Sequence, residues 1–167
     1  MRQKVYFEDL GLKSYQPTWD YQESLLANNT KIKSKAREKE EDVRQTATEH
    51  RLLFVEHPPV FTLGKNGKRE HVLVSAEHLQ KLGIEFFHIN RGGDITYHGP
   101  QQLVGYPIMD LDKFKTDLGW YLRSLEQVII DTIAEYGLVG ERSAGETGVW
   151  LQPNDPFLAR KICAMGI

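Results

Sequence analysis

Apolar residues along this chain recur with two periods, one typical of β-strands and one typical of helices. Residues 118–136 show the clearest helical pattern, behind a cap at Thr116 or Asp117. A shorter helix is predicted over 76–82, and a looser helical pattern follows Ser14. Short apolar runs predict strands over residues 4–7, 52–55, 60–63, 84–89, 95–97, 103–111, 149–151 and 161–167.

The order of these elements predicts the fold class. Strands and helices follow one another without the regular βα alternation of a parallel sheet, so we expect an α+β fold with a mixed or antiparallel sheet flanked by helices. The chain has 167 residues and no repeats or linker, which predicts a single domain over residues 1–167. Residues 31–49 are highly polar, and they are predicted to form either a solvated helix or a mobile excursion.

Composition excludes several classes of protein. A hydrophobic share of 40% and a charged share of 26% are ordinary for a globular protein, and no apolar run approaches the ~20 residues of a membrane span. A formal net charge of −2 argues against nucleic acid as a partner. The single cysteine excludes an internal disulfide and fits a reducing, cytoplasmic location. No membrane partner is expected.

The chain ends inside its last predicted strand, 161–167. A buried strand needs a partner for its backbone groups, because an unpaired edge invites aggregation. We therefore expect a domain that is incomplete at its C-terminal end. A natural terminal strand is the alternative.

One polar, glycine-rich segment, residues 91–98 (the glycine-rich strip), is attached directly to strands. Gly92 and Gly93 let a ligand approach the backbone closely. Arg91 carries a fork of donors suited to a carboxylate, phosphate or carbonyl. Tyr97 and His98 add polar groups at a strand end. A tight hairpin with a structural arginine is the alternative interpretation.

The strip and its flanks carry a resemblance to a family. RGGDITYHGPQQLVGYPI resembles the signature RGGxxTYHGPGQ of the lipoyl/octanoyl transferases. LLFVEHPPVFTLGKNG before it, and GVWL and KICAMG after it, are similar to further segments of that family. The matches run in order from about Arg51 to the end of the chain, which makes them far more specific together than singly.

The resemblance implies a fold related to the biotin and lipoate protein ligases. It implies transfer of an octanoyl group from octanoyl-acyl carrier protein to lysines of lipoyl domains, found in dehydrogenase E2 subunits and in the glycine cleavage H protein. No metal, nucleotide or prosthetic group is implied. The implied substrate-binding residues, expected to face one cleft, are Arg91, Gly92, Gly93, Asp94, Ile95, Thr96, Tyr97, His98, Ala164, Met165 and Gly166.

Lys161 matches the family's active-site lysine, which lowers the pKa of a nucleophilic cysteine and shuttles protons. The family's cysteine lies in a Pro-Cys-Gly segment, which would follow Ile167, so residues 1–167 alone are expected to be inactive. Cys163 lies two residues after Lys161, and in a regular strand both side chains share a face. Its position matches a packing site of the family, so we expect a buried, inert thiol.

Other interpretations stay open at this point. The chain has Asp94 where the family commonly has glutamine, and Gln101 where it usually has glycine. An ATP-dependent lipoate or biotin protein ligase is one alternative, and a non-catalytic relative that binds acyl carrier protein is another. Lys65, Lys68 and Arg69 are candidates for docking acidic partners, with a solvated loop as the alternative.

Overall fold

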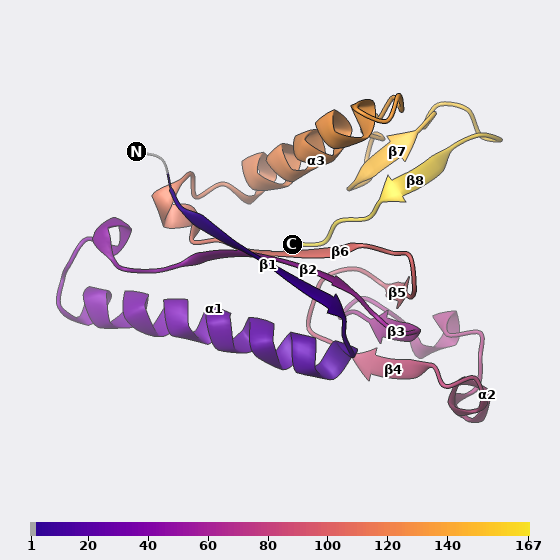
Figure 1. Cartoon of the computed structure of the whole chain (residues 1–167), viewed down its shortest axis with the longest axis horizontal. Helices are drawn as coiled ribbons and strands as arrows, with labels where there is room; N and C mark the ends of the chain where they lie inside the picture. Colours follow the sequence, from indigo (N-terminus) through magenta and orange to yellow (C-terminus); the bar gives the residue numbers. More distant parts are fainter. Residues whose placement is uncertain (1–2) are drawn as a thin grey trace. The chain divides into compact units, whose positions relative to one another are not determined.

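The computed structural model describes residues 3–167 in two units, Met1–Phe114 and Lys115–Ile167 (Figure 1). Both strands and helices are present in each unit, so the predicted α+β class is confirmed. The single domain over 1–167 stays a prediction. Within residues 3–167, no helix combines the length and the apolar character that crossing a bilayer requires.

The first unit contains a mixed sheet of β1 (Val5–Leu12), β2 (His50–Glu56) and β6 (Val104–Ile108), in the order β1-β2-β6. β1 runs parallel to β2, and β6 runs antiparallel to it. Leu53 and Val55 on β2 are buried, as alternation along a half-buried strand predicts.

A second mixed sheet of the same unit carries the glycine-rich strip. Its order is β4-β3-β5, with β3 (Val60–Leu63) at the centre, parallel to β4 (Glu85–His88) and antiparallel to β5 (Ile95–His98). The short helix α2 (Ala76–Lys81) precedes β4, and a 3₁₀ turn, Arg69–His71, precedes α2. Half of the strip is therefore strand β5, and the other half is the loop that enters it.

Helix α1 (Tyr15–Glu38) is long and mostly polar, and it is tied to the sheet by a few specific contacts. The buried Asn29 amide donates to the Glu49 carbonyl over 2.7 Å and accepts from the Glu49 N–H over 3.0 Å. Lys33 pairs with the buried Asp110 carboxylate at 2.8 Å. The solvated-helix interpretation of 31–49 is therefore right as far as Glu38, and a 3₁₀ turn at Val43–Gln45 follows.

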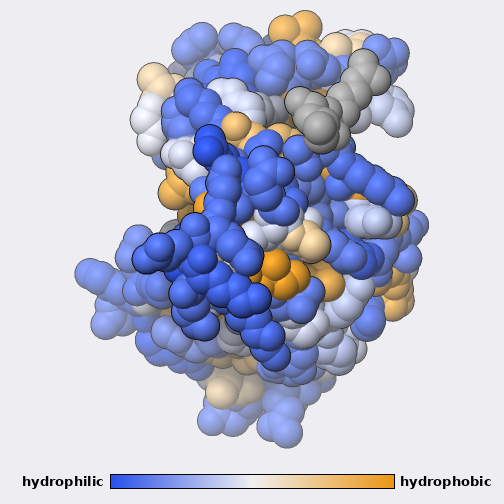
Figure 2. Space-filling model, turned by 90° about the vertical axis from the view of Figure 1, so that its left-hand side faces the viewer, coloured by the Kyte–Doolittle hydropathy of each residue, from blue (hydrophilic) through white to orange (hydrophobic). Residues whose placement is uncertain are grey.

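The face of the molecule drawn in Figure 2 is also largely polar. Hydrophilic residues predominate there, and the hydrophobic residues are scattered among them. Scattered apolar side chains are normal on a protein surface and indicate no particular partner.

The second unit contains α3 (Leu118–Ala134) and an antiparallel pair, β7 (Val149–Leu151) and β8 (Arg160–Cys163). The predicted cap at Asp117 is confirmed, because its carboxylate accepts the Trp120 N–H over 2.9 Å. Buried Glu126 ties α3 to β7. Its carboxylate accepts from Arg123 at 2.6 Å, from Arg142 at 2.9 Å and from the Gly148 N–H at 3.0 Å.

Several predicted boundaries were wrong for identifiable reasons. β6 ends at Ile108, because the Asp110 carboxylate accepts the Asp112 N–H and starts the 3₁₀ turn Leu111–Lys113. β8 ends at Cys163, and residues 164–167 have no assigned strand structure. β1 extends to Leu12, well beyond the predicted 4–7, because its backbone continues to pair with β2.

Replacing Glu126 should destabilise the second unit. Burial raises the pKa of this carboxyl, but the hydrogen bonds from Arg123, the Gly148 N–H and Arg142 outweigh burial and hold the pKa below its usual value. Its stabilisation is therefore present above the unfolded pKa of ~4.3 and is lost as pH falls through the lower folded pKa. Glu126→Gln should reduce the free energy of unfolding at pH 7 by about 3 kcal/mol.

Urea denaturation of wild type and variant between pH 7 and ~4 checks this prediction. The difference should shrink at the acidic end. Glu135→Gln, at an exposed position that caps α3, is the matched control and should change stability by less than ~0.5 kcal/mol. Equal losses in the two variants would contradict the role given to Glu126.

Candidate functional site

The glycine-rich strip is held by the turn that follows β3. The N–H groups of Gly64, Lys65 and Asn66 donate to carbonyls of the strip, at Asp94 (3.0 Å), Arg91 (3.0 Å) and Gly93 (3.2 Å) respectively. A Cβ at Gly64 would lie 2.5 Å from the Gly93 oxygen and 3.0 Å from the Arg91 oxygen. Only glycine permits this approach, so the position of the strip depends on Gly64.

The Arg91 guanidinium donates hydrogen bonds to neighbouring residues of its own loop and of β3 and β5. Its Nη1 donates to the Gly92 carbonyl at 2.8 Å, and its Nη2 lies 2.7 Å from Thr96 Oγ1 and 3.1 Å from Thr62 Oγ1. The Thr62 and Asp94 carbonyls are also 3.1 Å from Nη2. These contacts fasten the loop to β3 and β5. They favour a structural role for Arg91 over a guanidinium that is free to bind a ligand.

The second half of the strip is strand β5, which pairs in antiparallel register with β3. Ile95, Thr96, Tyr97 and His98 lie opposite Leu63, Thr62, Phe61 and Val60. Gly93 has a φ of 87°, a conformation that glycine adopts without a steric penalty. The strip therefore presents backbone at Gly92 and Gly93 and aromatic or imidazole side chains at Tyr97 and His98.

Asp94 and Gln101, the two departures from the family pattern, have visible structural roles. The Asp94 carboxylate pairs with His71 Nδ1 at 2.5 Å, and both side chains are nearly half exposed. Gln101 has a φ of 68°, and its N–H donates to Glu56 at 2.9 Å. A left-handed φ costs a non-glycine residue about 1 kcal/mol, which explains physically why glycine suits this position better.

His98, the last residue of the strip, lies in a cluster with His57, Tyr15 and Tyr106. Fully buried His57 places Nδ1 2.7 Å from the Lys13 carbonyl and Nε2 3.0 Å from the Tyr106 hydroxyl. Because the carbonyl only accepts, Nδ1 donates and Nε2 accepts the tyrosine proton. The Tyr15 ring lies 5.3 Å from the His57 ring and 6.3 Å from the His98 ring.

This cluster keeps its groups neutral. Burial lowers the pKa of His57, and burial raises the pKa of Tyr106 far above its usual value. The cluster is therefore uncharged near pH 7, apart from the neighbouring Arg91 guanidinium.

In the second unit, Lys161 lies beside a carboxylate and an aromatic ring. Its Nζ is 3.1 Å from the Glu146 carboxylate and 4.7 Å from the centroid of the Trp150 ring. An anion and an aromatic face both attract a cation. The side chain stays 31% exposed.

The expectation that Lys161 and Cys163 share a face is wrong. Val149 pairs with Cys163 and Trp150 pairs with Lys161, so Ile162 is an extra residue in β8, a β-bulge. Neighbouring residues of β7 point to opposite faces, and their partners on β8 do the same. The bulge therefore places Lys161 and Cys163 on opposite faces.

The Cys163 side chain is only partly buried, less than the buried thiol that the sequence predicts. Burial raises its pKa, and the negative charge of Glu126 raises it further. Both effects disfavour the thiolate, which is the nucleophilic form.

Ala164, Met165 and Gly166 follow β8 in a segment without assigned secondary structure, and the residues just before β7 contact it. Thr147 Oγ1 donates to the Met165 carbonyl at 2.9 Å. Gly148, with a φ of 99°, lies so close to the Cys163 carbonyl that a Cβ would overlap it. Glu146, Thr147 and Gly148 thus contact Lys161, Met165 and Cys163, respectively.

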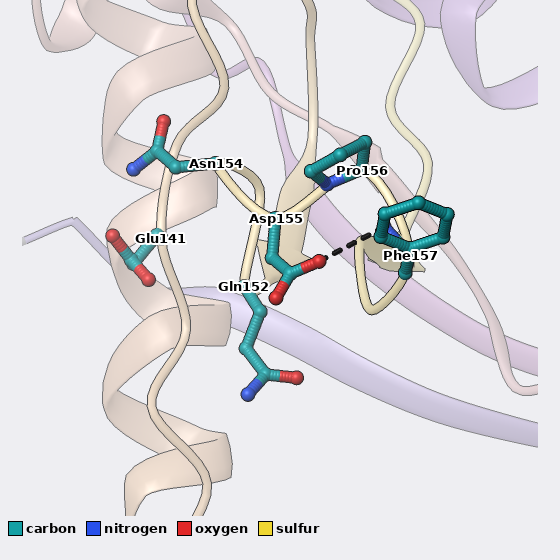
Figure 3. Close-up of a pocket in the computed structure, with 6 residues that line it drawn as sticks. All are labelled: Glu141, Gln152, Asn154, Asp155, Pro156 and Phe157. Atoms are coloured by element: carbon teal, nitrogen blue, oxygen red, sulfur yellow. Dashed lines mark hydrogen bonds between the residues drawn. The ribbon is translucent and has the colours of Figure 1, made fainter.

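The predicted site residues fall in both units, Arg91–His98 in the first and Lys161–Gly166 in the second. That the two segments face one cleft stays a prediction. A hollow of about 510 Å³ in the second unit is open and is lined by Glu141, Gln152, Asn154, Asp155, Pro156 and Phe157 (Figure 3). It contains none of the predicted residues, so it is not assigned as the substrate site.

The proposed docking residues lie beside the strip. Lys65 and Lys68 are exposed, and the Arg69 guanidinium lies 4.7 Å from the Phe86 ring centroid. Because the Lys65 N–H binds the Arg91 carbonyl, this basic turn is adjacent to the strip. Docking itself stays a prediction.

Sequence reasoning missed three residues that shape the site. A signal for Gly64 was available, because two glycines in a Gly-Lys-Asn-Gly segment are typical of a constrained turn. Gln102 and Glu146 carry no signal in a single sequence, because their partners are fixed by the fold. Gln102 binds His98 at 2.6 Å, and Glu146 binds Lys161.

Comparison with known proteins decides the family. A model of the lipoyl protein ligase A/B catalytic domain matches residues 14–167. Octanoyltransferases of Flavobacterium psychrophilum and Christiangramia forsetii are 54% and 53% identical to this chain over all 167 residues. The chain belongs to the octanoyltransferase family. It spans about 70% of the length of those two relatives.

Solved structures agree on the fold of this octanoyltransferase family member. A bi-partite lipoate protein ligase of Thermoplasma acidophilum matches 99% of the chain and 58% of its own chain, with a TM-score of 0.60 and 17% identity. A Plasmodium falciparum protein in complex with lipoate matches 89% of the chain and 41% of its own, with a TM-score of 0.61 and 12% identity. The predicted relation to the lipoate ligase fold is confirmed.

Gly64→Ala should displace the strip. The added methyl group would collide with the Gly93 and Arg91 carbonyls and break the bonds from the 64–66 turn, costing about 1–3 kcal/mol of unfolding free energy. Urea denaturation measures the loss. The control is Gly92→Ala, whose Cβ would meet nothing within 4 Å, and it should change stability by less than ~1 kcal/mol. A fully stable Gly64→Ala protein would show that the hydrogen bonds from the 64–66 turn to the strip are dispensable.

Proposed function

We propose that the full-length protein transfers an octanoyl group from octanoyl-acyl carrier protein to a lysine of a lipoyl domain. The reaction proceeds through an octanoyl thioester on a cysteine, which the lysine then converts to an amide. Acceptors of this kind are dehydrogenase E2 subunits and the glycine cleavage H protein. The observation that supports this proposal most is the 53–54% identity to octanoyltransferases along the whole chain.

The glycine-rich strip suits an apolar acyl chain. Its loop carbonyls and its arginine are bonded within the protein, so it offers backbone and ring surfaces with few free polar groups. Burying an eight-carbon chain against such a surface contributes roughly 0.8 kcal/mol per methylene. A strip fixed by Gly64 and Arg91 can therefore select acyl chains by length.

Lys161 is proposed as the residue that lowers the pKa of the nucleophilic cysteine. Glu146 and the Trp150 ring hold its ammonium group in position, and a neighbouring cation favours thiolate over thiol. The ammonium also supplies a proton to the carrier's leaving thiolate. The nucleophile is proposed to lie beyond Ile167, because Cys163 faces away from Lys161 and its pKa is raised.

The test incubates the full-length protein with octanoyl-acyl carrier protein and then with a lipoyl domain, without ATP. Mass spectrometry should show an octanoyl adduct on the enzyme that hydroxylamine removes, followed by an octanoyl group on the acceptor lysine. Residues 1–167 alone, and Cys163 in the full-length protein, should carry no adduct. A Cys163→Ala variant should retain full adduct formation.

Three outcomes would overturn the proposal. An adduct mapped to Cys163 would make that thiol the nucleophile. A requirement for ATP with free octanoate would indicate a ligase, which activates its acid as an adenylate. Binding of the carrier without any adduct would indicate a non-catalytic relative.

Lys161→Ala in the full-length protein should leave folding intact and reduce octanoyl transfer by at least ~100-fold. The nucleophilic thiol would return toward its unperturbed pKa near ~8.5, leaving few thiolates at pH 7. Lys161→Arg should restore little activity, because a guanidinium keeps the charge but does not release a proton. Steady-state rates and thermal unfolding check this. Full activity in either variant would remove Lys161 from the mechanism.

A further inference from the structure

The contacts of the Lys161 side chain are too exposed to fix its position by themselves. Its Nζ lies 3.1 Å from the Glu146 carboxylate and 4.7 Å from the centroid of the Trp150 ring. The Glu146 side chain is 55% exposed and the Lys161 side chain 31%. An ion pair this accessible to water contributes little net stability. The position of Lys161 therefore depends on what fixes Glu146 and Trp150.

Glu146 belongs to a short segment, residues 146–148, that is anchored at one end by a buried bond. Gly145 and Gly148 have left-handed φ values of 79° and 99°. Because glycine restricts the backbone little, these two positions do not hold the segment by themselves. The Gly148 N–H donates to Glu126 Oε1 over 3.0 Å, and this bond is buried. Glu126 thus anchors the segment that carries Glu146.

Trp150 is linked to the same carboxylate by a second path. Trp150 and Glu141 exchange two backbone hydrogen bonds, each of 2.8 Å. Arg142 follows Glu141 directly, and its Nε donates to Glu126 Oε2 over 2.9 Å. The segment that pairs with Trp150 is therefore also bonded to Glu126.

The Glu126 carboxylate is fully occupied by these bonds. Its Oε1 accepts from Gly148, and its Oε2 accepts from Arg123 at 2.6 Å and from Arg142. The side chain has no exposed area, so it cannot touch a substrate. Breaking one bond of a buried charge is costly, which gives the carboxylate a single position. Glu126 can act on a reaction only through the segments that it holds.

We propose that Glu126 is a positioning residue for Lys161. One buried carboxylate on α3 fixes the segment of Glu146 through the Gly148 N–H, and it fixes the segment that pairs with Trp150 through Arg142. The two contacts of the Lys161 side chain are thereby held in place together. This role rests on the proposed function, in which Lys161 assists the nucleophilic cysteine.

The experiment is a double-mutant cycle in the full-length protein, measured as the single-turnover rate of octanoyl adduct formation from octanoyl-acyl carrier protein. An amide has one acceptor oxygen where the carboxylate has two, so Glu126→Gln leaves one set of donors without a partner. At saturating carrier its rate should fall about 10-fold, with the half-saturating concentration unchanged, because misplacing a catalytic group slows the reaction. In a Lys161→Ala background, Glu126→Gln should change the rate by less than ~2-fold.

Ile133→Ala is the matched control for lost stability. Ile133 lies on α3, and its side chain packs so close to Gly140 that an added Cβ there would lie 2.7 Å from Ile133 Cδ1. Truncation destabilises the same unit without removing a hydrogen bond of Glu126. Its rate in the folded protein should stay within ~2-fold of its parent in both backgrounds. Urea denaturation identifies conditions under which every variant is folded.

A second measurement needs no substitution. In the wild-type protein, hydrogen exchange at the Gly148 amide should be slowed at least ~100-fold relative to an unprotected glycine amide, because its bond to Glu126 is buried. If Glu126→Gln fails to fold, Arg142→Gln replaces it in the cycle. The Arg142 side chain is 37% exposed, and its loss removes the path to Trp150 alone.

The outcomes separate this role from the proposed function. Equal rate losses from Glu126→Gln in the two backgrounds, an unchanged rate, or a freely exchanging Gly148 amide would each overturn the positioning role. Full adduct formation in Lys161→Ala, or no adduct in the wild-type protein, would instead overturn the proposed function.

Discussion

The turn at residues 64–66 and the carbonyls of the glycine-rich strip form the contact on which the site depends. Three backbone N–H groups satisfy three loop carbonyls, and the Arg91 guanidinium ties the same loop to Thr62 and Thr96. Because Gly92, Gly93 and Asp94 are exposed, water could also satisfy these carbonyls, so the bonds serve to fix the position of the loop. Together, the hydrogen bonds of the 64–66 turn and of Arg91 hold a glycine-rich segment in one position.

Charge is distributed unequally between the two candidate segments. Around His57 and His98, burial lowers the pKa of both imidazoles and favours their neutral forms. Around Lys161, a carboxylate and an indole ring lie 3.1 Å and 4.7 Å from the side-chain nitrogen.

Much of the fold could be predicted because local signals mark it. Strand 60–63 lies between Pro59 and Gly64, and the helix from Leu118 has an aspartate cap, so both begin where the sequence indicates. The bulge at Ile162 could not be predicted, because alternation along a strand contains no mark of an extra residue. The partners of Arg91, Gln102 and Glu146 were equally hidden, since contacts across the fold depend on its tertiary structure.

The inward bonding of Arg91 leaves a positive charge within the strip. The acceptors of its Nη1 and Nη2 groups are carbonyls and hydroxyls, which are neutral, so these bonds fix the guanidinium without cancelling its charge. Burial lowers the pKa of the neighbouring His98, and the Arg91 charge lowers it further. The residue that fastens the loop thus also helps to keep the imidazole at the end of the strip unprotonated.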